Sequence, residues 1–434
     1  MFLRKNTYRA LSYIAPHLAK LAGIFNNKIA EGIHARKGIK LRWRNKCRNL
    51  DRKKKIVWFH VASVGEFLQA KPVICLLSEK LGSSVDVALT FYSPSGIKNY
   101  SKFSLPGETE IINFVDYLPF DTPANARFCL NNLNPDIIIY VHSDLWPNLI
   151  MEASKVDIPQ ILISGTLSSK SKRLSPLVRS FYGELYSLLD SIAAISEKDA
   201  ARFKKYGRKL NIFTAGDTRF DQVIQRIENS DVKPLGIPTT GQNDFIIAGS
   251  TWPEDEKVVI PGFRKLISDY PELKLILAPH EPTGKRISKI KAALKDQGID
   301  YHLLSSIDQK SFDTKPVIIA DGVGYLAELY RFGSLAYIGG SFTTGVHNVM
   351  EPSVFSLPTL FGPRINNSFE ALKLISFGAG TIVETPEEFA ETASKFLNDR
   401  KLLEKYGKIA SEFIRNNSGA SEISCKLILN TLYR

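Results

Sequence analysis

Short runs of β-branched and aliphatic residues alternate with helical stretches along most of this 434-residue chain. Apolar strands separated by helices are typical of parallel sheets with helices on both faces. This alternation of strands and helices is interrupted once, by the Pro- and Gly-rich stretch 226–243, and then continues. The expected strands are 56–62, 85–91, 110–115, 136–142, 160–164, 191–195, 211–215, 245–249, 273–278, 317–320, 335–338 and 359–361. The sequence therefore predicts an α/β protein with two doubly wound, Rossmann-like units that face a cleft.

The length of the chain agrees with two domains, because a single core rarely extends beyond about 250–300 residues. We predict a basic arm at 1–50, a first unit at 51–228, a linker at 229–243 and a second unit at 244–416. A last helix within 417–434 could cross back to the first unit. The four cysteines are widely separated and form no C-x-x-C pair, which indicates neither a disulfide framework nor a zinc site. A reducing compartment fits best.

The net charge of +13 comes from the start of the chain. Residues 1–55 hold sixteen Lys or Arg and only two acids, Glu31 and Asp51, while bases and acids nearly cancel in the rest. The same segment has apolar residues at the helical spacing of three and four. These residues are Leu11, Ile14, Leu18, Leu21 and Phe25. A basic amphipathic helix is typical of a membrane surface, where anionic lipid contributes ~1 kcal/mol per cation.

Other interpretations of the arm remain open. Nucleic acid would explain its charge but not its apolar stripe, and an arm that is simply solvated is a third reading. A spanning helix is not favoured, because the best window, 10–27, contains Pro16, His17 and Lys20 and is shorter than the ~20 apolar residues that a bilayer requires. The arm also lacks the uninterrupted apolar core of a signal peptide. We therefore expect a peripheral or monotopic protein whose body faces the cytoplasm.

The segment 333–363 has the pattern of a nucleotide-sugar site, since the apolar run 335–338 leads into small and polar residues. These residues are Gly339, Gly340, Ser341, His347, Asn348 and Glu351. Glycine lets a backbone approach a ligand closely, and free N–H groups at a helix start favour an anion. The pattern predicts a phosphate site, although an ordinary strand-to-helix turn would look the same.

In the first unit, Ser63, Gly65 and Glu66 follow the first strand at the start of a helix. A carboxylate in this position is usually a favourable partner of the helix dipole. As a general base, Glu66 would stand at the C-terminal edge of the sheet, and Gly65 would leave room for an acceptor hydroxyl. Spacing alone does not decide between these two roles.

Further polar residues follow other strands and would face the same cleft. Asp144 follows the fourth strand, where it or Ser143 could equally cap the next helix. In the second unit, Ser250 and Thr251 end one strand and His280 ends another. A lone histidine at such a position is more often structural. The evidence for a site is therefore that all of these residues follow strand ends, and none of them is persuasive alone.

Several cofactor motifs are absent from the sequence. It contains no Walker A motif, no G-x-G-x-x-G in the first βα unit and no D-x-D motif. The His and Cys spacings match no zinc site. We therefore expect neither a cofactor nor a metal.

Six motifs, in order along the chain, resemble those of the 3-deoxy-D-manno-octulosonic acid (Kdo) transferases of lipopolysaccharide synthesis. They are HVASVGE (60–66), HSDLWPN (142–148), AGDTRFD (215–221), AGST (248–251), APHE (278–281) and GGSF through GVHNVMEP to FGP (339–363). The resemblance runs from about residue 56 to about residue 375, and the basic arm has a counterpart in the family.

The resemblance implies an inverting GT-B glycosyltransferase that needs no metal. It would move Kdo from CMP-Kdo to a lipid A precursor, lipid IVA, at the cytoplasmic face of the bacterial inner membrane, with the anionic membrane surface as a partner and no nucleic acid. Glu66 is similar to the family's catalytic base, and Ser63, Gly65 and Asp144 would contact the acceptor. The donor-binding residues implied are Ser250, Thr251, His280, Gly339, Gly340, Ser341, His347, Asn348, Glu351 and Arg219.

Some positions depart from the family pattern. The stretch 164–167 replaces a frequent Asn-Ala-Arg, Asp217 and Arg219 replace the usual Asn and Lys, and His142 and Asp144 stand where glutamates are common. These changes concern the acceptor rather than the class of reaction. Two other functions stay open: a GT-B transferase or epimerase that uses a UDP sugar, and a non-catalytic membrane or nucleic-acid binding module on a GT-B body.

Overall fold

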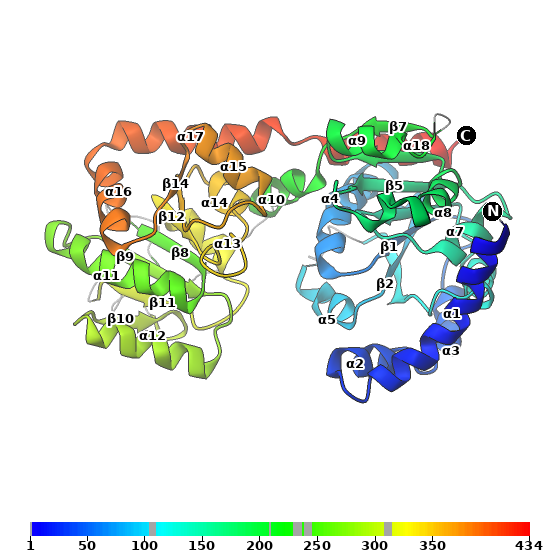
Figure 1. Cartoon of the computed structure of the whole chain (residues 1–434), viewed down its shortest axis with the longest axis horizontal. Coiled ribbons are helices and arrows are strands. Elements are labelled where there is room, and N and C mark those ends of the chain that lie inside the picture. The colour runs from blue at the N-terminus through cyan, green and yellow to red at the C-terminus, as the bar shows by residue number, and fades with distance from the viewer. Residues whose placement is uncertain (1, 104–109, 208–209, 229–236, 238–244, 308–314) are drawn as a thin grey trace. The chain divides into compact units, whose positions relative to one another are not determined.

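The computed structural model divides into two compact units of helices and strands (Figure 1). The first unit combines Met1–Gln222 with Asn417–Arg434, and the second unit is Val223–Asn416. The structure describes residues 2–103, 110–207, 210–228, 237, 245–307 and 315–434. Apart from residue 237, the predicted linker 229–243 therefore lies outside the described residues.

The first unit is built on a sheet of seven strands in the order β3-β2-β1-β4-β5-β6-β7, and every pair is parallel. The strands are β1 (Lys55–Val61), β2 (Val85–Phe91), β3 (Ile112–Tyr117), β4 (Ile137–Val141), β5 (Gln160–Gly165), β6 (Ser191–Ala194) and β7 (Ile212–Thr214). The strand order reverses between β1 and β4. Ligands of open α/β sheets bind at the carboxyl ends of the strands beside such a reversal, and here those ends lead to Glu66 and Asp144.

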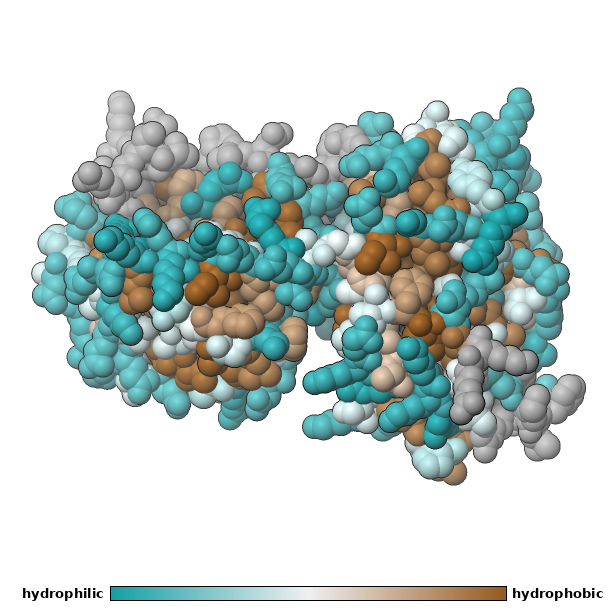
Figure 2. Space-filling view, turned by 90° about the horizontal axis from the view of Figure 1, so that it is seen from above, coloured by the Kyte–Doolittle hydropathy of each residue, from teal (hydrophilic) through white to brown (hydrophobic). Residues whose placement is uncertain are grey.

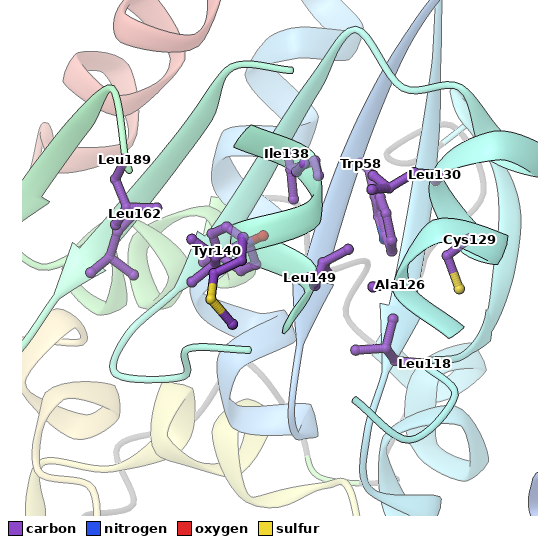
Figure 3. Packing of buried hydrophobic residues seen from close by; sticks show 14 of the residues in the cluster. Trp58, Leu118, Ala126, Cys129, Leu130, Ile138, Tyr140, Leu149, Leu162 and Leu189 are labelled. Atoms are coloured by element: carbon purple, nitrogen blue, oxygen red, sulfur yellow. The ribbon is translucent and has the colours of Figure 1, made fainter. Parts of the chain in front are cut away.

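Two hydrophobic clusters pack in this unit, and β1 contributes to both because successive side chains of a strand point to opposite faces. Trp58 belongs to one cluster and Phe59 to the other. Figure 3 shows Trp58 in the first cluster with Leu130, Ile138 and Leu149.

The helices of the first unit are α1 (Phe2–Ala22), α2 (Asn27–Ala35), α3 (Ile39–Arg48), α4 (Val64–Leu81), α5 (Pro94–Phe103), α6 (Pro123–Leu133), α7 (Pro147–Ser154), α8 (Pro176–Tyr186), α9 (Glu197–Lys204), α10 (Thr218–Glu228), which continues into the second unit, and α18 (Ala420–Leu432).

The last helix, α18, packs against α4 of the first unit. Its buried residues Cys425, Ile428 and Leu432 join the cluster that contains Phe59 and Phe67. The end of the chain therefore completes the hydrophobic core of the unit in which the chain begins.

Part of the segment predicted as an arm is integral to the first unit. On α3, Trp43 is fully buried, and its Nε1 donates to the carbonyl of Tyr117 at 3.0 Å. Arg36 is also buried, and its guanidinium donates to the carbonyls of Leu118 and Tyr92. Trp43 and Arg36 therefore hold α3 and the end of α2 on the first unit.

The helix α1 contacts the first unit through polar residues on one side. Tyr8 donates its hydroxyl to Asp121 at 2.9 Å, and Arg9 pairs with the buried Glu152 at 3.0 Å. The predicted apolar stripe is exposed, from 49% at Ile14 to 91% at Phe25. No helix among the described residues is both long enough and apolar enough to cross a bilayer.

The second unit has its own sheet of seven parallel strands in the order β10-β11-β9-β8-β12-β13-β14. The strands are β8 (Phe245–Thr251), β9 (Lys274–Pro279), β10 (Tyr301–Leu303), β11 (Val317–Ile319), β12 (Leu335–Ile338), β13 (Thr359–Phe361) and β14 (Gly380–Ile382). The helices are α11 (Pro253–Asp269), α12 (Gly284–Asp296), α13 (Leu326–Leu329), α14 (Met350–Val354), α15 (Phe369–Ser376), α16 (Pro386–Asn398) and α17 (Arg400–Asn416). The prediction of two doubly wound α/β units is confirmed; it missed the three-residue strands β10 and β14.

Candidate active site

Glu66 lies in the first turn of α4, directly after β1. Its Oε2 accepts a hydrogen bond from the N–H of Ala62, and its own N–H donates to Ser63 Oγ at 3.4 Å. The helix-start role that the sequence left open is therefore present in the structure. The N–H of Ser63 also interacts with this carboxyl, so the hydrogen bonds that it receives from the described residues come from the backbone at the start of its own helix.

The environment of Glu66 also changes its acidity. Burial raises the pKa of this carboxyl to about 7, and the charge of Asp144 adds to the rise, against a smaller lowering by the N–H groups of Ala62 and Ser63. A carboxyl that titrates near neutral pH is suited to accept a proton from a hydroxyl. Gly65 is exposed, and a Cβ there would meet only Ser63 Oγ at 3.7 Å, so the space beside Glu66 is open.

Asp144 follows β4, and the residue directly after this strand has an unusual backbone conformation. His142 has a φ of +64°, in the left-handed region that non-glycine residues rarely adopt. Such strain is common at functional sites. Burial raises the pKa of Asp144, and the Arg173 guanidinium lowers it. The charge of Asp144 therefore acts on Glu66, and the charge of Arg173 acts on Asp144.

The helix after Asp144 is capped by a different acid. Trp146 occupies the cap position of α7 without a side-chain bond, while Asp121 accepts from the N–H groups of Asn148 and Leu149, both at 3.0 Å. The interpretation of Asp144 as a helix cap is therefore wrong. Sequence reasoning missed Asp121, because this acid lies after a different strand, β3.

Arg219, assigned by resemblance to the donor, lies in the first unit. It pairs with Asp217 at 2.7 Å, and both residues influence the pKa of His142, which burial lowers. The other nine residues assigned to the donor lie in the second unit.

In the second unit, the glycine turn after β12 is tightly packed. A Cβ on Gly339 would lie 2.4 Å from the Ser250 carbonyl oxygen, and one on Gly340, whose φ is +96°, would lie 2.5 Å from the Gly345 carbonyl oxygen. Ser250 itself has a φ of +54°. Only glycine fits these two positions, so the chain brings the ends of β8 and β12 into backbone contact.

Asp255 holds this turn in place. It is fully buried on α11 and accepts hydrogen bonds from the N–H groups of Gly340 (2.9 Å) and Trp252 (2.7 Å) and from the Tyr337 hydroxyl (2.9 Å). Ser341 is equally buried and accepts from the N–H of Gly362 at 2.6 Å. The role of Asp255 was missed, since its partner Gly340 is 85 residues away.

Thr251 is part of a second buried group. Its hydroxyl donates to Glu256 at 2.9 Å, and Glu256 also pairs with Arg286 at 2.5 Å. Burial raises the pKa of Glu256 to about 7, against the lowering effect of Arg286. Thr251 therefore points its polar atom into the unit, in contrast to the partly exposed Ser250.

His280 and His347 form a stack with Trp252. The two histidine rings are 4.4 Å apart at an angle of 14°, and Trp252 lies 5.1 Å from His280. Trp252 Nε1 donates to His347 Nε2 at 2.9 Å, which leaves the proton of a neutral His347 on Nδ1. Burial lowers the pKa of His347, and His280 lowers it further.

Asn348 lies directly before the cap of the short helix α14, and Glu351 lies in the first turn of this helix. Asn348 accepts from the N–H of Met350 at 3.0 Å, and Glu351 pairs with Arg226 at 2.9 Å. Burial raises the pKa of Glu351, and Arg226 lowers it. Arg226 was not predicted, because α10 lies 125 residues before Glu351. Within the described ranges, no three His, Cys, Asp or Glu side chains are grouped to hold a metal ion.

Residues 37–222 match the family model described as 3-deoxy-D-manno-octulosonic-acid transferase (Kdo transferase). Over longer stretches, the chain is similar to three proteins named 3-deoxy-D-manno-octulosonic acid transferase. The protein of Haemophilus influenzae is 26% identical over 377 residues (84% of each chain), that of Rickettsia prowazekii 28% over 370 residues (83% of this chain, 77% of the relative), and that of Aquifex aeolicus 27% over 349 residues (80% and 87%).

Solved structures share the fold at low identity. A UDP-GlcNAc 2-epimerase from Neisseria meningitidis has a TM-score of 0.58 and 16% identity, with 87% of this chain and 99% of that chain covered. A glycosyltransferase from Rickettsia africae has a TM-score of 0.55 and 11% identity, with 88% and 99% covered.

Two parallel doubly wound units, each with polar side chains at its strand ends, and these structural relatives define a protein of the GT-B class. Sequence then separates the transferases from the epimerases that share this fold. The family match over residues 37–222 and the relatives along more than three quarters of the chain make it similar to the Kdo transferases, and these homologues indicate a glycosyltransferase.

Proposed function

We propose that this chain transfers Kdo from CMP-Kdo to a lipid A precursor, lipid IVA, at the cytoplasmic face of a bacterial inner membrane. The proposal rests chiefly on Glu66, a half-buried carboxyl with a pKa of about 7 at the end of β1, in a chain that is similar to Kdo transferases along most of its length. Transfer with inversion requires one base to take the proton of the acceptor hydroxyl.

Glu66 acts as that base in the proposed mechanism. Oε2 stays on the N–H of Ala62 and fixes the carboxyl, while Oε1 accepts the proton. The acceptor hydroxyl enters over Gly65, beside Ser63 and Asp144. As the hydroxyl loses its proton to Glu66, its oxygen forms the new bond to the anomeric carbon of Kdo, and the bond from that carbon to the phosphate of CMP breaks.

The second unit binds CMP in this proposal. The Gly339–Gly340 turn lets the backbone approach the ligand closely, and Asp255, which accepts the N–H of Gly340, keeps the turn in one conformation. Glu351 accepts the ribose hydroxyls, with Arg226 holding its carboxylate. His280, Ser250 and Asn348 supply polar groups for the phosphate. The leaving phosphate gains negative charge, which fixed donors stabilise without a metal.

The membrane part of the proposal rests on the exposed stripe of α1. Leu11, Ile14, Leu18 and Leu21 are each about half exposed or more, while Arg9 on the same helix pairs with Glu152. Figure 2 shows that hydrophilic residues cover most of the visible surface, with hydrophobic residues gathered in patches. Apolar side chains that stay uncovered on a basic helix are suited to the membrane interface.

The experiment that tests the function is incubation of the full chain with CMP-Kdo and tetraacyl lipid A precursor, followed by mass spectrometry of the lipid. The expected result is a lipid that has gained Kdo. A parallel reaction with UDP-GlcNAc tests the rival epimerase or UDP-sugar transferase. Turnover of UDP-GlcNAc without Kdo transfer would replace the proposal, and no turnover of either donor would favour a non-catalytic module.

A further inference from the structure

Arg173 is a half-buried cation in the first unit that has no ion-pair partner within the described part of the chain. Among the residues that the structure describes, no carboxylate oxygen lies within the 4.0 Å of an ion pair. Its Nη1 donates one long hydrogen bond, 3.5 Å, to the neutral hydroxyl of Tyr186, and its guanidinium lies 5.3 Å from the ring centroid of Tyr182. An arginine has five N–H donors, so most of its capacity to bind an anion is unused.

The surroundings of Arg173 fix its position. The loop that carries it starts at Leu167, a buried residue whose N–H donates to Asp199 at 2.8 Å. Arg202 closes the same loop by binding both the Leu167 carbonyl and Asp199. Near the end of the loop, Ser171 accepts from the N–H of Arg173 at 3.3 Å. The guanidinium is therefore held on aromatic residues by a short, anchored loop rather than carried by a free surface segment.

The loop that carries Arg173 is bonded to the segment that carries Asp144. The N–H of Thr166, directly before Leu167, donates to the carbonyl of His142 at 3.2 Å, and His142 lies two residues before Asp144. In agreement with this placement, the charge of Arg173 lowers the pKa of Asp144, whose own charge raises that of Glu66. Asp144 is too far from Arg173 to neutralise it as an ion pair. The two acids, Glu66 and Asp144, would repel an anionic acceptor unless Arg173 binds its anionic group.

We propose that Arg173 forms an oxyanion subsite that binds a phosphate or carboxylate of the acceptor beside Glu66. The inference rests on the proposed function, since it assumes an acidic glycolipid as acceptor. Arginine suits this task because its planar fork donates two parallel hydrogen bonds to one oxyanion. The phosphate could be that of the lipid A precursor, and the carboxylate could be that of a Kdo unit already attached.

The test measures the KM for the acceptor with Arg173→Ala and Arg173→Lys at saturating CMP-Kdo. Three acceptors distinguish the sources: phosphorylated precursor, the same lipid after phosphatase treatment, and precursor that carries one Kdo. If phosphate is bound, Arg173→Ala raises the KM for the phosphorylated precursor about tenfold to a hundredfold and leaves that for the treated lipid unchanged. If a carboxylate is bound, only the Kdo-bearing acceptor loses affinity. Arg173→Lys should fall between wild type and Arg173→Ala.

The matched control is Lys172→Ala, which removes the neighbouring exposed charge. Tyr186→Phe removes only the hydrogen bond from Arg173, and thermal unfolding reports whether each variant folds. An unchanged KM for all three acceptors in a folded Arg173→Ala protein overturns the proposal, as does an equal loss in Lys172→Ala. If Arg173→Ala does not fold, Arg173→Lys decides by the same criteria.

Equilibrium binding of the phosphorylated precursor, without CMP-Kdo, separates this proposal from the proposed function. A chain that transfers no Kdo, yet binds this lipid in a manner that depends on Arg173, would retain the subsite and lose the transferase assignment. A chain that transfers Kdo with an unchanged KM in Arg173→Ala would retain the function and lose the subsite.

Discussion

Asp144 lies close enough to Glu66 for its charge to raise the pKa of the Glu66 carboxyl. The two acids follow β1 and β4, the neighbouring strands at which the order of the sheet reverses. Because both carboxyls are half-buried, they interact more strongly than they would in water. This pair is the basis for the predicted dependence of activity on pH.

The first prediction concerns that pH dependence. Glu66 must be deprotonated to act as a base, so kcat/KM should rise with pH through about pH 7. In Asp144→Asn one negative charge near Glu66 is lost, which lowers the pKa of Glu66 and should move this rise to lower pH, by a few tenths to about one unit. The profile of kcat/KM against pH measures the shift. Asp157→Asn, an exposed change in the same unit, is the control, and a shift in the opposite direction would contradict the coupling.

The second prediction concerns the stripe on α1. Leu18→Ser with Leu21→Ser should reduce binding to anionic vesicles severalfold or more, because each side chain loses apolar area that enters the interface. Added salt should weaken binding of the wild type, since screening reduces attraction between exposed charges. Vesicle co-sedimentation measures both effects. The control is Leu177→Ser, at an exposed leucine outside the arm. Equal binding to neutral and anionic vesicles would argue against the role of charge.

The third prediction concerns Glu351. If its carboxylate accepts ribose hydroxyls, Glu351→Ala should weaken CMP binding by roughly 1 to 3 kcal/mol, about tenfold to somewhat over a hundredfold. Calorimetric titration with CMP, UMP and deoxy-CMP would measure this, with Glu387→Ala as an exposed control in the same unit. Unchanged CMP affinity would remove the ribose role. A preference of the wild type for UMP would contradict a CMP-sugar donor.

The fold could be predicted from sequence because its main signal is local. Buried parallel strands are continuous apolar runs, and such runs at β1, β4, β8 and β12 are unmistakable. The position of α3 on the sheet was harder to predict from the sequence. Its many cations suggested an exposed arm, while Trp43, whose burial fixes the helix on the sheet, is a single residue in a basic segment.

The candidate site was predictable only in part, because some of its contacts are local in sequence and others are not. Glu66 and Asp144 follow their strands directly, so their placement at one sheet edge follows from the order of the chain. Asp255 and Arg226 act on residues 85 and 125 positions away, and nothing in their local sequence indicates the partner. Arg173 lies in a loop whose path depends on contacts with Asp199. Such contacts arise from tertiary packing, so only the structure reveals them.

The central claim is that Glu66 removes the proton of the acceptor in Kdo transfer. Glu66→Gln keeps the size of the side chain and an oxygen for the N–H of Ala62 but loses basicity, so the helix start should survive. The matched control is Glu79→Gln, an exposed change on the same helix. The decisive measurement is the single-turnover rate of Kdo transfer to the lipid A precursor by both variants and the wild type. We predict a fall on the order of 10² to 10⁴ for Glu66→Gln alone, with CMP affinity unchanged; a near-normal rate would contradict the account and leave Glu66 as a helix cap.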